Sequence, residues 1–146
     1  VGPFEILDTR YIVESEACAL AALSITPEQI KDLRDIVVEM EEEEKQLNAS
    51  EVADMKFHLA IAEATQNSVL ISIVNWLWEL RNQSRLSKVF MSRLRDEGIH
   101  PSIEEHKRIV SALERGDPER ARNAMKVHIE GATEAAAAYF EKNEPY

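Results

Sequence analysis

The segment DMKFHLAIAEATQN, residues 54–67, determines the fold class and contains the most unusual polar residues of the chain. Its apolar residues recur three or four positions apart, which is the spacing of one face of an α-helix. That face consists of Asp54, Phe57, His58, Ile61, Ala62 and Thr65. The spacing therefore predicts a helix that turns an acid and an imidazole, one helical turn apart, toward the protein interior.

The same periodicity continues on both sides of this segment, so we predict an all-α fold with no strand. Two capping boxes mark helix starts, one at residues 26–29 and one at residues 102–105, and Gly98 and Gly116 mark helix ends. The length of the fourth helix allows a kink or a break. We therefore expect a single antiparallel bundle of six to seven helices. The second expected helix begins at about residue 26 and includes the acidic run at 41–44. The other expected helices cover about residues 3–23, 48–67, 68–96, 102–116 and 117–142.

The composition is that of one compact domain covering residues 1–146. Hydrophobic residues make up 45% of the chain, and only four glycines and five prolines interrupt the pattern. No apolar run approaches the roughly 20 residues that a membrane-spanning helix needs. Cys18 is the only cysteine, so no internal disulfide forms. These features predict a cytoplasmic protein without a membrane segment.

The charge balance argues against nucleic-acid binding by this chain. There are 27 acidic and 17 basic residues and a net charge of −10, which repels phosphate backbones. The nearest approach to a basic stripe has few aromatic neighbours that could stack on bases, and it consists of Arg81, Arg85, Lys88, Arg93 and Arg95. The acidic run Glu39 and Glu41 to Glu44 is interpreted as a solvated helix face rather than a cation site.

Two further histidines lie on apolar faces of other predicted helices. His106 shares its face with Ile109 and Leu113, and His128 shares its face with Met125. A single such histidine is more often a satisfied core residue than a ligand. Three histidines on three helices of one bundle, together with Asp54, instead predict a metal site, because a buried carboxylate is costly unless it is paired or ligates a metal. The fourth histidine, His100, precedes a proline and is expected in an exposed loop.

The predicted ligands Asp54, His58, His106 and His128 indicate the type of ion. Three nitrogens and one oxygen suit one divalent transition metal ion, zinc first, then nickel, cobalt or manganese, and disfavour calcium and magnesium. An open coordination position would bind a small carboxylate, or it would activate water as in a mononuclear metallohydrolase. A bundle whose buried histidines are purely structural is the third interpretation. A ferritin-like di-iron site is excluded, because Met55, Ile103 and Met125 stand where its glutamates would be.

Arginine and tryptophan supply the remaining candidates for a binding site. Arg10 falls on the apolar stripe of the first predicted helix, where it either extends to solvent or binds a carboxylate in bidentate fashion. Arg81 and Arg85 are candidates for the same effector-binding role. Trp76 and Trp78 point to different faces of the fourth helix, where they line a pocket, a dimer contact or the core.

The quoted segment resembles a signature of the FadR C-terminal domain, or FCD domain, of GntR-type transcription regulators. Residues 105–117 (EHKRIVSALERGD) and 121–129 (ARNAMKVHI) are similar to two further signatures of that domain, and residues 10–22 (RYIVESEACALAA) are similar to its first helix. These segments follow in the right order and cover nearly the whole chain.

This resemblance implies a non-enzymatic sensor domain whose helices enclose an effector cavity. It implies that Asp54, His58, His106 and His128 ligate the ion and that Arg10 helps to bind a small organic acid. Residues 77–84 (LWELRNQS) are similar to regulators of hexuronate catabolism, so a sugar acid is the expected effector. The resemblance also implies a homodimer that contacts DNA only through an N-terminal winged helix-turn-helix domain, which this chain lacks.

Overall fold

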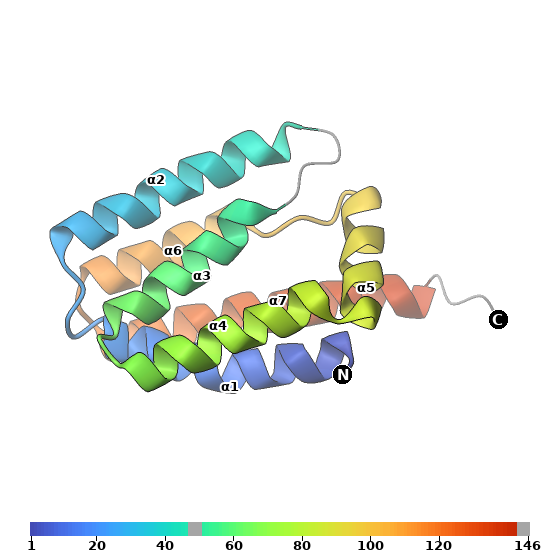
Figure 1. The fold of residues 1–146 in the computed structure, drawn as a ribbon. Helices are drawn as coiled ribbons and strands as arrows, with labels where there is room; N and C mark the ends of the chain where they lie inside the picture. Colours follow the sequence, from blue (N-terminus) through green and yellow to red (C-terminus); the bar gives the residue numbers. More distant parts are fainter. Residues whose placement is uncertain (47–50, 143–146) are drawn as a thin grey trace.

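The computed structural model describes residues 1–46 and 51–142, which form seven α-helices and no strand (Figure 1). The predicted all-α class is confirmed. The helices pack as an antiparallel bundle in which α1 lies against α7 and α4, while α2, α3 and α6 cover the other side. The helices are α1 (Pro3–Ala21), α2 (Pro27–Glu44), α3 (Val52–Ala64), α4 (Ser68–Gln83), α5 (Arg85–Asp96), α6 (Ile103–Glu114) and α7 (Pro118–Lys142).

The long fourth helix that the sequence predicts is broken into α4 and α5 at Ser84. The backbone of Ser84 is extended, with φ −62° and ψ 121°, and its hydroxyl accepts a hydrogen bond from the backbone N–H of Ser87. Ser84 therefore caps a new helix, which stands across the end of the bundle (Figure 1). The predicted start of the third helix at Asn48 lies outside the described residues.

The predicted capping box before α2 is present in full. The hydroxyl of Thr26 accepts a hydrogen bond from the backbone N–H of Gln29, and the Gln29 side chain accepts one from the backbone N–H of Thr26. The second predicted capping box is only half formed. Ser102 caps α6 by accepting a hydrogen bond from the backbone N–H of Glu105, whereas the Glu105 carboxylate accepts one from His128. No helix in the described ranges is long and apolar enough to cross a membrane.

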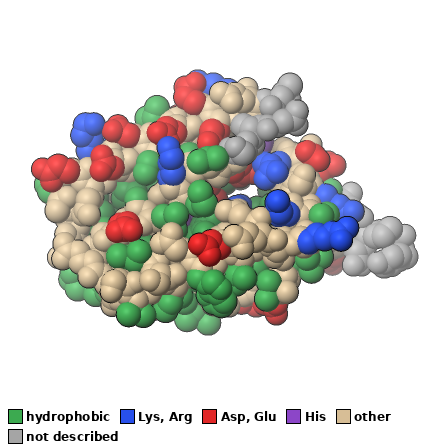
Figure 2. Space-filling model, viewed as in Figure 1, with side chains coloured by type: hydrophobic (Ala, Val, Ile, Leu, Met, Phe, Trp, Pro, Cys, Tyr) green, Lys and Arg blue, Asp and Glu red, His purple; other side chains and the backbone are tan. Residues whose placement is uncertain are grey.

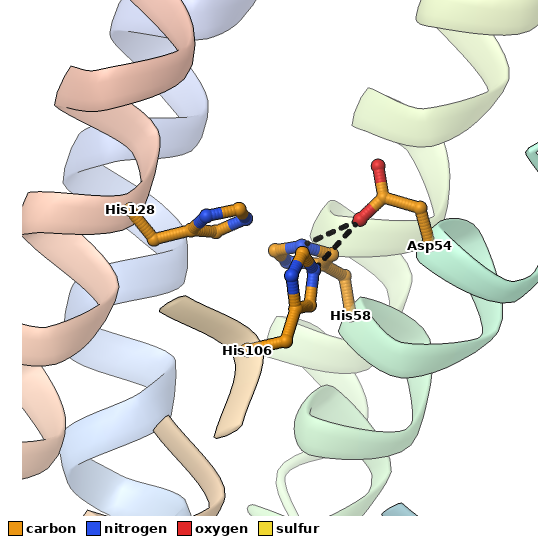
Figure 3. Close-up of side chains that lie close together, drawn as sticks. All are labelled: Asp54, His58, His106 and His128. Atoms are coloured by element: carbon orange, nitrogen blue, oxygen red, sulfur yellow. Dashed lines mark hydrogen bonds and ion pairs between the residues drawn. The ribbon is translucent and has the colours of Figure 1, made fainter. Parts of the chain in front are cut away.

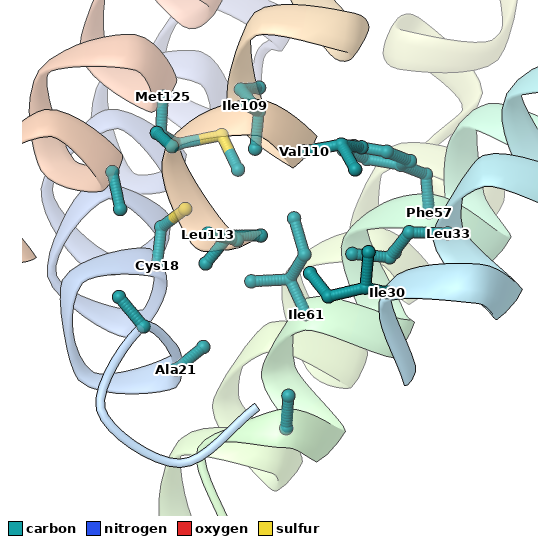
Figure 4. Packing of buried hydrophobic residues seen from close by; sticks show 14 of the residues in the cluster. Cys18, Ala21, Ile30, Leu33, Phe57, Ile61, Ile109, Val110, Leu113 and Met125 are labelled. Carbon is teal, nitrogen blue, oxygen red and sulfur yellow. The ribbon is translucent and has the colours of Figure 1, made fainter. Parts of the chain in front are cut away.

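The main hydrophobic core lies where α1, α2, α3, α6 and α7 meet (Figure 4). Burial of each large side chain in it contributes roughly 1.5–3 kcal/mol to folding. A second cluster surrounds Trp78 and a third surrounds Phe90. Phe57 of the main core and Trp78 of the second cluster both pack against the ring of His58, so apolar packing holds the buried polar residues from several sides.

Candidate metal centre and adjoining cavity

The four residues predicted as metal ligands lie together in the interior of the bundle. Asp54 and His58 project from α3, His106 from α6 and His128 from α7 (Figure 3). One nitrogen or oxygen of each residue lies within 4.8 Å of those of the other three. All four side chains are buried, so three helices bring one carboxylate and three imidazoles to a common point.

Asp54 contacts two of the three imidazoles of this cluster. Its Oδ1 atom lies 3.2 Å from Nε2 of His58 and 3.0 Å from Nε2 of His106. Burial by itself would raise the pKa of Asp54, but the interactions of its carboxylate with the two imidazoles outweigh it and hold the pKa well below its usual range. The cluster therefore contains an ionised carboxylate.

The second ring nitrogen of His106 has a partner that determines its protonation. Nδ1 of His106 lies 2.6 Å from the backbone carbonyl oxygen of Ser102, one turn earlier in the chain. A carbonyl oxygen only accepts hydrogen bonds, so Nδ1 carries the proton in the neutral ring. The lone pair of neutral His106 is then on Nε2, the nitrogen that faces Asp54.

The other two histidines are held in the same way by glutamates. Nδ1 of His58 lies 2.6 Å from Oε1 of Glu14, and Nδ1 of His128 lies 2.9 Å from Oε1 of Glu105. Gly131 leaves room for the second glutamate, since a Cβ atom at Gly131 would lie 3.0 Å from Oε2 of Glu105. Each imidazole thus donates from Nδ1 and keeps Nε2 for the interior of the cluster.

This donor set fits a divalent transition metal ion. In their neutral forms the rings present lone pairs toward an anionic carboxylate, and Nε2 of His58 is buried without a hydrogen-bond partner among the described residues. In the metal-free protein, a proton bound to an imidazole offsets part of this excess of lone pairs and negative charge. Burial by itself would lower the pKa of His58, but Glu14 and Asp54 outweigh it and raise the pKa. Burial lowers the pKa of His128 to about 4 despite its bond to Glu105.

Arg10 is buried and does not extend to solvent. Its Nε atom donates a hydrogen bond of 2.5 Å to Oε2 of Glu14, and its guanidinium carbon lies 4.3 Å from the ring centre of Trp78. Burial by itself would raise the pKa of Glu14, but Arg10 and His58 lower it to about 2. Sequence reasoning missed Glu14, although it lies one helical turn after Arg10 on the same stripe.

A cavity of about 210 Å³ adjoins the cluster. Its ionisable lining residues are Arg10, Glu51, Asp54, Arg81, His100, Glu105 and His128. Nη2 of Arg81 lies 4.0 Å from Oδ2 of Asp54. Its apolar lining is contributed largely by α5, α7 and the start of α1. These apolar lining residues include Pro3, Ile6, Leu7, Phe90, Met91, Leu94, Ala132, Ala135 and Ala136.

The remaining predicted site residues lie in different places. Arg85 is exposed and is absent from the cavity lining, so the structure does not bring it to the site. Trp78 is buried and contacts both Arg10 and Arg81, whereas Trp76 is 55% exposed. His100 is exposed, as predicted, and lies at the edge of the cavity.

Sequence comparisons relate the chain to transcription regulators. The FCD domain family matches residues 5–131. The Uxu operon regulator of Haemophilus influenzae is 39% identical over 131 residues, covering 89% of this chain and 49% of that protein. The Uxu operon transcriptional regulator of Escherichia coli is 38% identical (88% and 51%), and the Exu regulon transcriptional regulator of the same organism is 32% identical (88% and 49%). The chain thus spans about half the length of these curated relatives.

Two solved structures share the fold. Escherichia coli McbR/YncC superposes with a TM-score of 0.74 at 21% sequence identity, covering 93% of this chain and 64% of that one. Streptococcus agalactiae GntR superposes with a TM-score of 0.66 at 23% identity, covering 89% and 57%. The overall arrangement of the helices is therefore a known one.

Proposed function

Because this chain belongs to the FCD domain family, we propose that it is the effector-binding domain of a GntR-type transcription regulator whose response depends on a bound metal ion. One observation carries the proposal. A buried cluster of one carboxylate and three imidazoles opens onto a cavity that also contains two guanidinium groups. DNA binding would then belong to another domain of the full-length regulator, since this chain is acidic.

Asp54, His58, His106 and His128 are the proposed metal ligands. The orientation of the imidazoles supports this assignment, because hydrogen bonds at Nδ1 leave Nε2 of each ring available to an ion. Nitrogen-rich donors of this kind suit zinc first and also nickel, cobalt and manganese. A bound ion would supply a positive charge that could bind the carboxylate of an effector.

The proposed effector is a small organic acid, in particular a sugar acid such as a hexuronate. Arg10 and Arg81 provide cationic groups beside the metal site, and Ser87, Ser102 and His100 provide polar atoms for hydroxyl groups in the cavity lining. The cavity volume of about 210 Å³ restricts the ligand to a small molecule. The names of the Uxu and Exu relatives agree with a hexuronate-type effector.

The alternative of a mononuclear metallohydrolase receives less support. A hydrolase needs a base beside the ion to activate water. Of the nearby carboxylates, Glu14 and Glu105 already accept hydrogen bonds from Nδ1 of His58 and His128. Glu51 also lines the cavity, and burial raises its pKa to about 7, so it is the carboxylate there that could act as a base. The two Uxu relatives and the Exu relative are all named as regulators, which supports the prediction that the chain is not an enzyme.

A thermal-shift screen on zinc-loaded protein tests the effector class. Glucuronate at 100 times its Kd should stabilise the protein by about 2.7 kcal/mol. For a chain of this size, each kcal/mol corresponds to about 2–4 °C, so the expected rise in Tm is roughly 5–10 °C. Glucose, which has a similar size but no carboxylate, should give no shift. Equal shifts for both sugars, or no shift with any organic acid, would contradict the proposal.

The proposed partner is a second copy of this chain, docked on the outer face of α1 and α4. Trp76 and Val69 of α4 are 55% and 65% exposed, and Ile12 of α1 is 66% exposed. Hydrophobic side chains gather over these two helices in Figure 2. Glu79 is the only charged residue in the segment 68–80, whereas the chain as a whole carries a net charge of −10. The α4 part of this face therefore adds little repulsion between two like-charged copies, and an apolar surface with an exposed tryptophan suits a symmetric contact.

Sedimentation analysis tests this dimer face. Trp76→Glu should convert a dimer into a monomer, because the contact would bury an unpaired charge in each copy. Val38→Glu makes the same kind of change at a residue on α2 that is 57% exposed, and it should leave the dimer intact. A monomeric unmodified protein at all concentrations, or equal behaviour of the two variants, would disprove the assignment.

A further inference from the structure

We propose that Glu14 is a positioning residue that links Arg10 to His58, so that an acid bound at Arg10 raises the affinity of the site for its metal ion. This inference rests on the proposed function, and it assigns a role to a residue that the ligand set does not include. The role is a coupling between two binding events, since Glu14 would touch neither the ion nor the acid.

The link consists of two hydrogen bonds to one carboxylate. Oε2 of Glu14 accepts from Nε of Arg10 at 2.5 Å, and Oε1 accepts from Nδ1 of His58 at 2.6 Å. The three side chains are buried, with exposed fractions of 5% for Arg10, 2% for Glu14 and 1% for His58. Because water is excluded, the two partners compete for the negative charge of one carboxylate with little screening.

The two ends of this link face different ligands. Nε2 of His58 lies 3.2 Å from Oδ1 of Asp54, within the proposed metal site. Arg10 lines the cavity, and its two terminal nitrogens have no hydrogen-bond partner in the part of the chain that the structure describes. Those nitrogens form the edge of the guanidinium that a carboxylate would bind. Glu14 thus stands between an unpaired cationic edge and a metal-facing imidazole.

The expected coupling has a definite sign. An acid on the terminal nitrogens of Arg10 would draw the guanidinium charge away from Glu14. The carboxylate would then accept more strongly from Nδ1 of His58, and this makes Nε2 a better electron donor to a metal. The affinity for the ion should therefore rise when acid binds, and by linkage the ion should raise the affinity for acid by the same factor.

Glu105 provides the matched comparison. It accepts a hydrogen bond of 2.9 Å from Nδ1 of His128, so it orients a proposed ligand just as Glu14 does. Among the ion pairs of the described residues, Glu105 pairs with His128 and with no arginine. Glu105 should therefore support metal binding without coupling the metal affinity to acid binding at Arg10. Glu16 is a second control, because it lies on α1 close to Glu14 but pairs with Arg122, away from the site.

The test measures zinc affinity by competition with a chelator, with and without glucuronate, in Glu14→Gln, Glu105→Gln and Glu16→Gln. Glu14→Gln should weaken zinc binding by about 10- to 100-fold. It should also reduce the enhancement that glucuronate gives to zinc binding. Glucuronate binding to zinc-free Glu14→Gln should not weaken, because Arg10 has lost its counter-ion and is free to bind the acid. Glu105→Gln should weaken zinc binding by a similar factor but keep the enhancement. Glu16→Gln should change neither quantity.

A merely structural role for Glu14 predicts a different pattern. Zinc and glucuronate affinities would then fall together with the Tm, and the enhancement would be lost equally in Glu105→Gln; either result overturns the inference. If Glu14→Gln did not fold, Arg10→Met would decide. Loss of the competing guanidinium should raise zinc affinity in the absence of acid, as acid binding does, and should remove the further enhancement by glucuronate. Unchanged or weaker zinc binding in Arg10→Met would overturn the inference. If unmodified protein bound zinc but no acid, the acid-sensor proposal and the coupling would both fail, and the zinc measurement alone would show whether Glu14 positions His58.

Discussion

Replacing His106 with alanine is expected to abolish the stabilisation that zinc gives to this protein. The imidazole is fully buried, its Nδ1 is held by the Ser102 carbonyl, and its Nε2 lies 3.0 Å from Asp54. A zinc concentration of 100 times the Kd stabilises the unmodified protein by about 2.7 kcal/mol. If loss of one of four ligands weakens binding 100-fold, only about 0.4 kcal/mol remains at the same concentration. Thermal unfolding with and without zinc measures this difference.

The matched control for this variant is His100→Ala. His100 is exposed and lies outside the cluster of four, so its replacement should keep the full zinc-induced rise in Tm. Each variant should be compared with its own metal-free form, because His106→Ala also removes the contact with Asp54. An undiminished zinc response in His106→Ala would show that the ligand assignment is wrong.

The second large effect is expected at Phe57. Its side chain is fully buried, and its ring centre lies 4.7 Å from that of His106 and 5.6 Å from that of His58. Phe57→Ala should lower the free energy of unfolding by about 3–5 kcal/mol through lost burial and the cavity left behind. This is a large part of the roughly 5–15 kcal/mol that stabilises a typical domain. Urea denaturation of the metal-free protein measures the loss.

Phe4→Ala is the control for this second prediction. Phe4 is 37% exposed and packs edge to face on Phe90, so its removal should cost no more than about 1–2 kcal/mol. Because Phe57 supports two ligand rings, Phe57→Ala should also reduce the zinc-induced rise in Tm, whereas Phe4→Ala should not. Equal losses of stability in the two variants would contradict the central place of Phe57 in the core.

The break between α4 and α5 shows why one feature of the fold could not be predicted with certainty. No proline or glycine interrupts residues 68–96, so local propensity is compatible with a continuous helix. The break at Ser84 allows Phe90 to pack on Phe4 of α1 and on Phe140 of α7. These contacts join residues that are far apart in the chain, and helix propensity does not register them.

The candidate metal cluster could be predicted from the sequence because helical periodicity is a local property. The spacing of Asp54 and His58 places both side chains on one face of α3, and that face must turn inward to bury its apolar neighbours. The same reasoning applies to His106 and His128. Since the inward faces of a single small bundle meet in one interior, these polar residues had few other places to lie.

The sequence by itself therefore determined the all-α class, the inward faces of the helices and the convergence of four polar side chains. Only the tertiary structure decided which of the nearby charged residues serve that cluster. Glu14 reaches His58 from 44 positions away because α1 packs beside α3, and Arg81 lines the cavity whereas Arg85 does not because the chain turns at Ser84. Periodicity assigns a residue to a face of its own helix, but hydrogen-bond partners depend on how helices pack against one another.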